Sequence, residues 1–188
     1  GGHTSCVEIR TADNDLIVLD MGTGLVPLGN SLLQESNPPK SAHVFISHFH
    51  WDHIIGYLGF APFFLKDFTC HIYGKQDKLS IDEIFGHLHN YTFWPVEIPM
   101  YQAELNLNTF PENGLKISDS VKISACKHGH PNGANSYRIE IGDKVIVYST
   151  DLEHPDDQLN PNVIDIARDA DVLIMDAQFT DEQLTAHK

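Results

Sequence analysis

The sequence predicts an α/β protein in which two packed β-sheets are covered by helices. Strand-like apolar segments dominate both halves of the 188-residue chain, and helical segments lie between them. The chain is 41% hydrophobic and 20% charged, as in soluble globular proteins. It shows no repeat, and no segment longer than residues 37–40 resembles a linker. We therefore expect one domain over residues 1–188, long enough to bury a core without disulfides.

The elements of the first half follow from apolar runs bounded by turn residues. The run at 16–19 predicts a strand that pairs across the polar turn at 12–15, and a glycine turn at 21–24 precedes a helix. We expect strands within 6–20 and at 43–47 and 70–73, and helices at 25–34 and 79–88.

The second half alternates apolar and polar residues more regularly, which favours strands. We expect strands at 102–110, 115–125, 136–141, 144–149 and 172–175, and helices at 163–168 and from Asp181 onward.

The segment that carries chemistry is the run of residues 47–53, directly after an expected strand. It contains His48, His50, Asp52 and His53, and imidazole and carboxylate groups at this density are typical of transition-metal ligands. Side-chain alternation places His48 and His50 on one side of an extended segment. Asp52 and His53 fall where the chain turns toward a helix, so one short loop can serve two metal ions.

The charge balance excludes some classes of partner. The chain has 12 Lys and Arg against 26 Asp and Glu, a formal net charge of −14. This balance disfavours nucleic-acid binding and a polybasic membrane anchor, and leaves a small-molecule substrate as the expected partner. The three cysteines lie far apart in the sequence, which fits a reducing cytoplasm. The sequence sets no oligomeric state.

The motifs of this chain resemble those of the metallo-β-lactamase superfamily of hydrolases. His48, His50, Asp52 and His53 match its H-x-H-x-D-H motif, and the turn at 20–24 resembles its upstream aspartate and glycine turn. His130 and Asp151 stand where its later histidine and its bridging aspartate are expected. The resemblance implies an αββα sandwich with two mixed sheets, here truncated at both ends.

The resemblance also implies the roles of these residues. His48, His50 and His130 would bind one metal ion, and Asp52, His53 and Asp151 a second, with Asp151 bridging both. Asp52 and Asp151 would be the catalytic carboxylates, because they hold two ions that share a nucleophilic hydroxide. Zinc is the expected metal, with manganese and iron as alternatives.

The strand at 137–140 and the turn at 176–178 look closest to the cyclic-phosphate phosphodiesterase-like branch of the superfamily. The expected substrate is therefore a phosphodiester or a cyclic phosphate. A thioester or lactam hydrolase on the same scaffold, and a regulatory module that binds metal or ligand without turnover, remain alternatives.

Two further aspartates are candidates for orienting the metal ligands. Asp20 follows a buried strand and is expected to orient a ligating imidazole, or else to accept backbone N–H groups in its turn. Asp176 has a similar role or caps the last helix. The superfamily's last metal-ligating histidine has no convincing match, because His187 lies too few residues past Phe179 and Thr180. We expect this ligand beyond Lys188, and the alternative is a second metal site with one ligand fewer.

Other histidines and aromatic residues are open to two interpretations. His128 could share the face of His130 and contact substrate, or lie on the surface. Tyr91, Phe93 and Trp94, within residues 79–110, could form a lid over the site or belong to the core.

Overall fold

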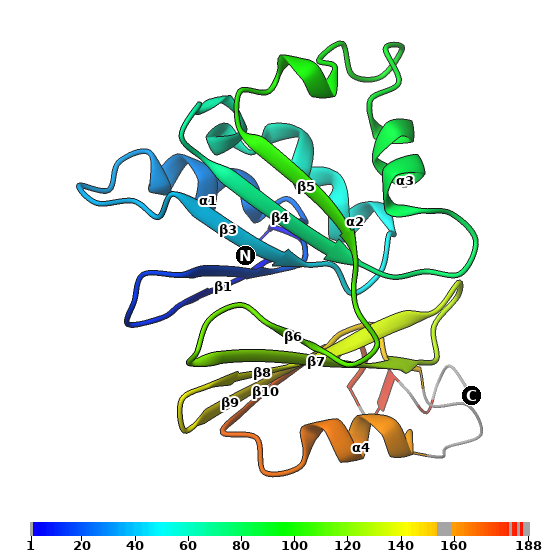
Figure 1. Cartoon of the computed structure of the whole chain (residues 1–188). Helices are drawn as coiled ribbons and strands as arrows, with labels where there is room; N and C mark the ends of the chain where they lie inside the picture. Colours follow the sequence, from blue (N-terminus) through cyan, green and yellow to red (C-terminus); the bar gives the residue numbers. More distant parts are fainter. Residues whose placement is uncertain (1, 154–158, 181, 184, 186–188) are drawn as a thin grey trace. The chain divides into compact units, whose positions relative to one another are not determined.

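The computed structural model describes residues 2–153, 159–180, 182, 183 and 185. The chain divides into two compact units, an N-terminal unit over Gly1–Leu115 and a C-terminal unit over Lys116–Lys188. Each is described by itself below, and Figure 1 shows the elements of both.

The N-terminal unit contains a five-stranded mixed sheet in the order β1-β2-β3-β4-β5 (Figure 1). β1 and β2 pair antiparallel, and the remaining neighbours pair parallel. The strands are β1 (Val7–Arg10), β2 (Leu16–Leu19), β3 (Ser41–Phe45), β4 (Thr69–Gly74) and β5 (Glu104–Thr109).

Helices cover one face of this sheet. Alternate residues of β2, β3 and β4, such as Val18, Val44 and Ile72, join the helical side chains in one buried apolar cluster. The helices are α1 (Leu25–Leu32), α2 (Trp51–Ile54), α3 (Ile81–Leu88) and the 3₁₀ helices η1 (Ile55–Gly59), η2 (Ala61–Phe64) and η3 (Ile98–Met100). α3 begins at a capping box in which Ser80 and Glu83 each bond the other's backbone N–H.

The C-terminal unit holds most of a second mixed sheet, in the order β10-β9-β8-β7-β6. β7, β8 and β9 form an antiparallel meander, and β10 pairs parallel with β9. α4 (Pro161–Ala167) contacts β7, β8 and β9 (Figure 1). The strands are β6 (Leu115–Lys116), β7 (Val121–His128), β8 (Ala134–Ile141), β9 (Lys144–Ser149) and β10 (Val172–Met175).

These observations confirm the predicted α/β class with two mixed sheets and flanking helices. The strand expected over 115–125 is instead two strands, because a turn in which the Val121 N–H bonds Ser118 O separates β6 from β7. The last expected helix begins at Asp181, which lies outside the described residues. The single domain over 1–188 stays a prediction.

Two of the aromatic residues after α3 lie outside the core, whereas Trp94 is partly buried. Tyr91 is 77% exposed and Phe93 is 82% exposed, so the core interpretation is wrong for both.

Within the described ranges, every helix is too short or too polar to pass through a lipid bilayer.

Candidate metal centre

A buried aspartate organises the ligand loop of the N-terminal unit. Asp20 follows β2 with a φ of 62°, and its backbone N–H bonds Phe45 O at the end of β3. Its fully buried carboxylate accepts hydrogen bonds from Ser47 N at 2.6 Å, Ser47 Oγ at 2.8 Å and His53 Nδ1 at 2.7 Å. A left-handed backbone is uncommon for any residue except glycine, and Asp is among those that tolerate it best.

These bonds determine which nitrogen of each ring is left for a metal ion. An ionised carboxylate can only accept, so His53 Nδ1 carries the proton and His53 Nε2 keeps its lone pair. Ser47 gives its one hydroxyl proton to Asp20, and it therefore accepts from His48 Nδ1 at 3.1 Å. His48 thus also keeps its lone pair on Nε2. An oxygen partner on the other ring nitrogen is the usual arrangement of a metal-binding histidine.

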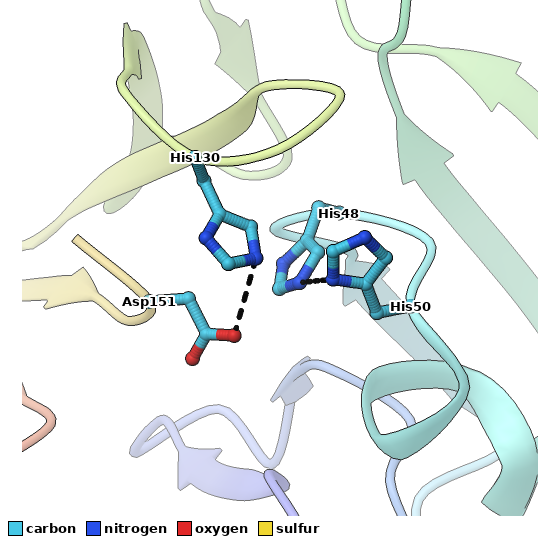
Figure 2. Close-up of side chains that lie close together, drawn as sticks. All are labelled: His48, His50, His130 and Asp151. Atoms are coloured by element: carbon cyan, nitrogen blue, oxygen red, sulfur yellow. Dashed lines mark hydrogen bonds and ion pairs between the residues drawn. The ribbon is translucent and has the colours of Figure 1, made fainter. Parts of the chain in front are cut away.

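The spacing of the ring nitrogens also fits a metal ion. His48 Nε2 and His50 Nδ1 face each other at 3.0 Å, as Figure 2 shows. Two nitrogen ligands bound tetrahedrally to one zinc ion lie about 3.3 Å apart. The expected placement of His48 and His50 on one side of the chain is therefore observed, and this donor set fits a transition metal.

Asp52 and His53 form the second half of this loop. Asp52 lies in the first turn of α2 and is 57% exposed, and its Oδ2 lies 3.4 Å from His53 Nε2. Backbone contacts hold this helix against the Asp20 turn, because Met21 N bonds His53 O and Gly56 N bonds Met21 O. A side chain at Gly56 would collide with the backbone of Gly22, and a side chain at Gly22 would collide with the backbone of Asp52 and Ser5, which explains the glycine at both positions.

In the C-terminal unit, His130 and Asp151 lie close together. His130 follows β7 and Asp151 follows β9, and His130 Nε2 lies 3.5 Å from Asp151 Oδ2 (Figure 2). Asp151 has a φ of 55°, so both aspartates that follow strands β2 and β9 adopt the left-handed conformation. His130 Nδ1 lies 3.3 Å from Glu153 Oε1.

Asp176 lies beside Asp151. The Asp151 N–H donates to Asp176 Oδ1 at 2.8 Å, so the Asp176 carboxylate contacts the backbone of the expected bridging ligand. The partner is a backbone N–H and not an imidazole, so the orienting role expected for Asp176 stays a prediction.

His128 is in neither of the places expected for it. It is 4% exposed, so both the substrate-facing and the surface interpretation are wrong. Its Nδ1 lies 2.8 Å from Ser136 Oγ and its Nε2 lies 3.0 Å from Thr150 O. Burial lowers the pKa of His128 below its ordinary value, which favours the neutral ring.

Two residues of the site were missed in the sequence. Ser47 gave no signal beyond its place before His48, and its role depends on its distance to Asp20. Glu153 follows Asp151 by two residues, a spacing that could have marked it as a partner for the nearby histidine. His187 lies outside the described residues.

A family model described as the beta-lactamase superfamily domain matches residues 16–188. The chain belongs to this superfamily. Its members are generally metal-dependent hydrolases. No curated protein matches the chain.

Solved structures with the metallo-β-lactamase fold match nearly the whole chain. The metallo-β-lactamase fold protein YhfI from Bacillus subtilis has a TM-score of 0.66 at 22% identity, and the match covers 96% of this chain and 66% of that one. The short form of human tRNase Z has a TM-score of 0.67 at 18% identity, and the match covers 97% of this chain and 74% of that one. Unliganded yeast PDE1 has a TM-score of 0.65 at 15% identity, and the match covers 96% of this chain and 73% of that one. The chain thus spans just under two thirds of YhfI, and at these identities the similarity shows the fold alone.

Proposed function

We propose that the chain is a binuclear metal-dependent hydrolase of phosphodiesters, and of small cyclic phosphates in particular. The observation that carries the proposal is the hydrogen bonding of the ligand loop. Asp20 and Ser47 occupy Nδ1 of His53 and His48 and leave Nε2 of both rings with a lone pair. Metal-binding histidines almost always show this arrangement, in which an oxygen partner binds the ring nitrogen that does not face the ion.

The proposed ligand sets follow the superfamily motif. His48, His50 and His130 hold one ion, and Asp52, His53 and Asp151 hold the other, with Asp151 shared. When bound, divalent ions supply a lowered pKa for water and positive charge beside the phosphoryl oxygens. We expect zinc, because imidazole and carboxylate ligands suit it, and manganese and iron accept the same groups.

In this proposal the side chains of the chain position the metal ions and do not themselves attack the substrate. Ser47 Oγ lies 3.1 Å from His48 Nδ1, which superficially resembles a serine–histidine nucleophile pair. However, Ser47 is fully buried and its proton is directed to Asp20, so its oxygen cannot reach a substrate. Asp151 has a side chain that is 28% exposed, and it is the carboxylate that we propose to hold both ions.

The net charge of −14 bears on the substrate. One structural neighbour is a tRNase by name, but a chain with this charge repels a long polyanion. A small phosphodiester carries one negative charge, which two divalent ions more than neutralise. We still predict that the protein is located in the cytoplasm and that it does not bind a membrane.

The test combines metal analysis with turnover of bis(p-nitrophenyl) phosphate. Wild-type protein reconstituted with zinc is expected to retain between one and two equivalents and to hydrolyse this ester. Asp151→Ala is expected to reduce turnover at least 100-fold, because it removes the shared ligand. Asp143→Ala, whose carboxylate is 89% exposed beside Lys144 in the β8–β9 turn, is the matched control and should retain wild-type rates.

Each contrary result has a definite meaning. Protein that binds no zinc or manganese would refute the metal centre. Faster hydrolysis of a thioester or a lactam than of any phosphodiester would refute the substrate class and leave the hydrolase. Metal binding without turnover of any ester would favour a ligand-binding module.

A further inference from the structure

A row of buried polar side chains runs across the three strands of the meander, at the end of the sheet that leads to His130 and Asp151. It consists of His128 at the end of β7, Ser136 in β8 and Ser149 at the end of β9. Both serines are fully buried, Ser136 Oγ lies 2.8 Å from Ser149 Oγ, and His128 Nδ1 lies 2.8 Å from Ser136 Oγ. Polar groups are costly to bury unless they are hydrogen-bonded, and a satisfied network fixes one arrangement.

The direction of every hydrogen bond in this row follows from one carbonyl group. Thr150 O can only accept, so His128 Nε2 carries the proton at 3.0 Å from it. His128 Nδ1 must then accept from the Ser136 hydroxyl. Because the Ser136 hydroxyl donates its one proton to His128, its oxygen accepts a hydrogen bond from the Ser149 hydroxyl. The row thus holds His128 as the neutral Nε2–H tautomer.

The acceptor of this proton belongs to the peptide group that precedes Asp151. The carbonyl of Thr150 and the N–H of Asp151 are the two ends of one planar peptide unit. His128 binds the carbonyl end, and Asp176 Oδ1 binds the N–H end at 2.8 Å. A side chain therefore holds each end of this peptide group. The residue that follows it, Asp151, has the left-handed conformation.

We infer that His128 is a positioning residue for Asp151, and that together with Asp176 it clamps the Thr150–Asp151 peptide so that the carboxylate is directed to the metal ions. The orientation of this peptide sets the direction of the Asp151 Cα–Cβ bond. A second bond between the same segments, from Glu153 N to Gly129 O at 3.1 Å, keeps the end of β7 beside the end of β9. The inference rests on the proposed function, because it takes Asp151 to be a metal ligand.

Two substitutions separate the clamp from a merely structural histidine. His128→Gln places an amide N–H near the position of Nε2 and retains a donor for Thr150 O. His128→Asn places its amide near Nδ1, so it retains a partner for Ser136 and loses the bond to Thr150. Both replace one buried ring by one buried amide, which makes them a matched pair.

The first measurement is amide hydrogen exchange of Asp151 in the metal-free protein. We expect exchange in His128→Asn to be at least tenfold faster than in wild type, and exchange in His128→Gln to stay within about threefold. The second is zinc affinity by chelator competition, where His128→Asn is expected to lose 10- to 100-fold and His128→Gln much less. Equal exchange rates and equal zinc affinities in the two variants would overturn the clamp.

A measurement on the wild-type chain keeps the inference testable if His128→Asn does not fold. A long-range ¹H–¹⁵N spectrum of the metal-free protein at neutral pH should report His128 as the Nε2–H tautomer, and the Nδ1–H tautomer would overturn the clamp. Wild-type protein without zinc binding would overturn the proposed function and with it the positioning of a ligand. Protected exchange at Asp151 would then identify the proposed function as the part that failed.

Discussion

The two units hold their candidate ligands in different ways. In the N-terminal unit, His48 and His53 are buried, and the groups that orient them, Asp20 and Ser47, are fully buried too. In the C-terminal unit, the side chains of His130 and Asp151 are 13% and 28% exposed, and the carboxylate beside His130 Nδ1 is 59% exposed. There the buried polar groups contact the backbone before Asp151 instead.

This difference predicts how each half responds to change. Hydrogen bonds to a buried carboxylate act in a low dielectric and leave costly unpaired groups when one partner is lost. A solvated carboxylate is replaced by water at little cost. Substitutions around His53 should therefore affect metal binding far more than equivalent substitutions around His130.

The largest effect is expected for Asp20→Asn. The Asn Oδ1 can still accept from Ser47 N, but its amide N–H₂ then faces His53 Nδ1 and Ser47 Oγ. His53 is driven to the Nε2–H tautomer, and the nitrogen that should bind metal becomes protonated. We expect zinc affinity to fall about 100-fold, measured by chelator competition.

Asp119→Asn is the control, since Asp119 is fully exposed and forms an ion pair with Lys116, away from the candidate ligands. It should bind zinc as wild type does. Unchanged zinc affinity in Asp20→Asn would show that the buried carboxylate does not set the tautomer of His53.

A smaller effect is expected within the ligand loop itself. Asp52→Ala removes an exposed ligand of the proposed second ion, so the protein should retain about one equivalent of zinc. His50→Ala removes a ligand of the first ion. Elemental analysis after gel filtration measures both, and loss of all metal in Asp52→Ala with none lost in His50→Ala would contradict the proposed division of ligands.

The smallest effect is expected for Glu153→Gln. Its carboxylate lies 3.3 Å from His130 Nδ1 but is mostly solvated, so we expect zinc affinity to change less than about threefold. The variant is read in the same competition assay as Asp20→Asn. A loss as large as that of Asp20→Asn would remove the distinction between the two units.

The sequence predicted the strands best where apolar runs end at turn residues. The strand expected at 172–175 is β10 with the same limits, and the helix expected at 25–34 is α1 with two residues fewer. The 3₁₀ helices η1 and η2 were not predicted, because their glycine and proline residues resemble a loop.

The candidate site divides along a similar line. His48, His50, Asp52 and His53 could be found because their spacing is local. His128 could not be placed correctly, because its burial depends on Ser136 and Thr150 on neighbouring strands. Local spacing reveals which groups can bind a metal, whereas the groups that orient them become visible only through contacts across strands.

The antiparallel meander of the C-terminal unit has a consequence for the order of folding. β7, β8 and β9 are joined by short turns, so the contacts that bring His130 to Asp151 close loops of about twenty residues. The contact of Asp20 with His53 spans 33 residues and depends on parallel pairing of β2 with β3. Local antiparallel contacts form faster than parallel crossovers. A refolding chain should therefore protect the amides of β8 and β9 before those of β2 and β3. The bond from His128 to Thr150 O would then form while the tautomer of His53 is still undetermined, whereas the bond from Asp176 waits for the parallel pairing of β10 with β9.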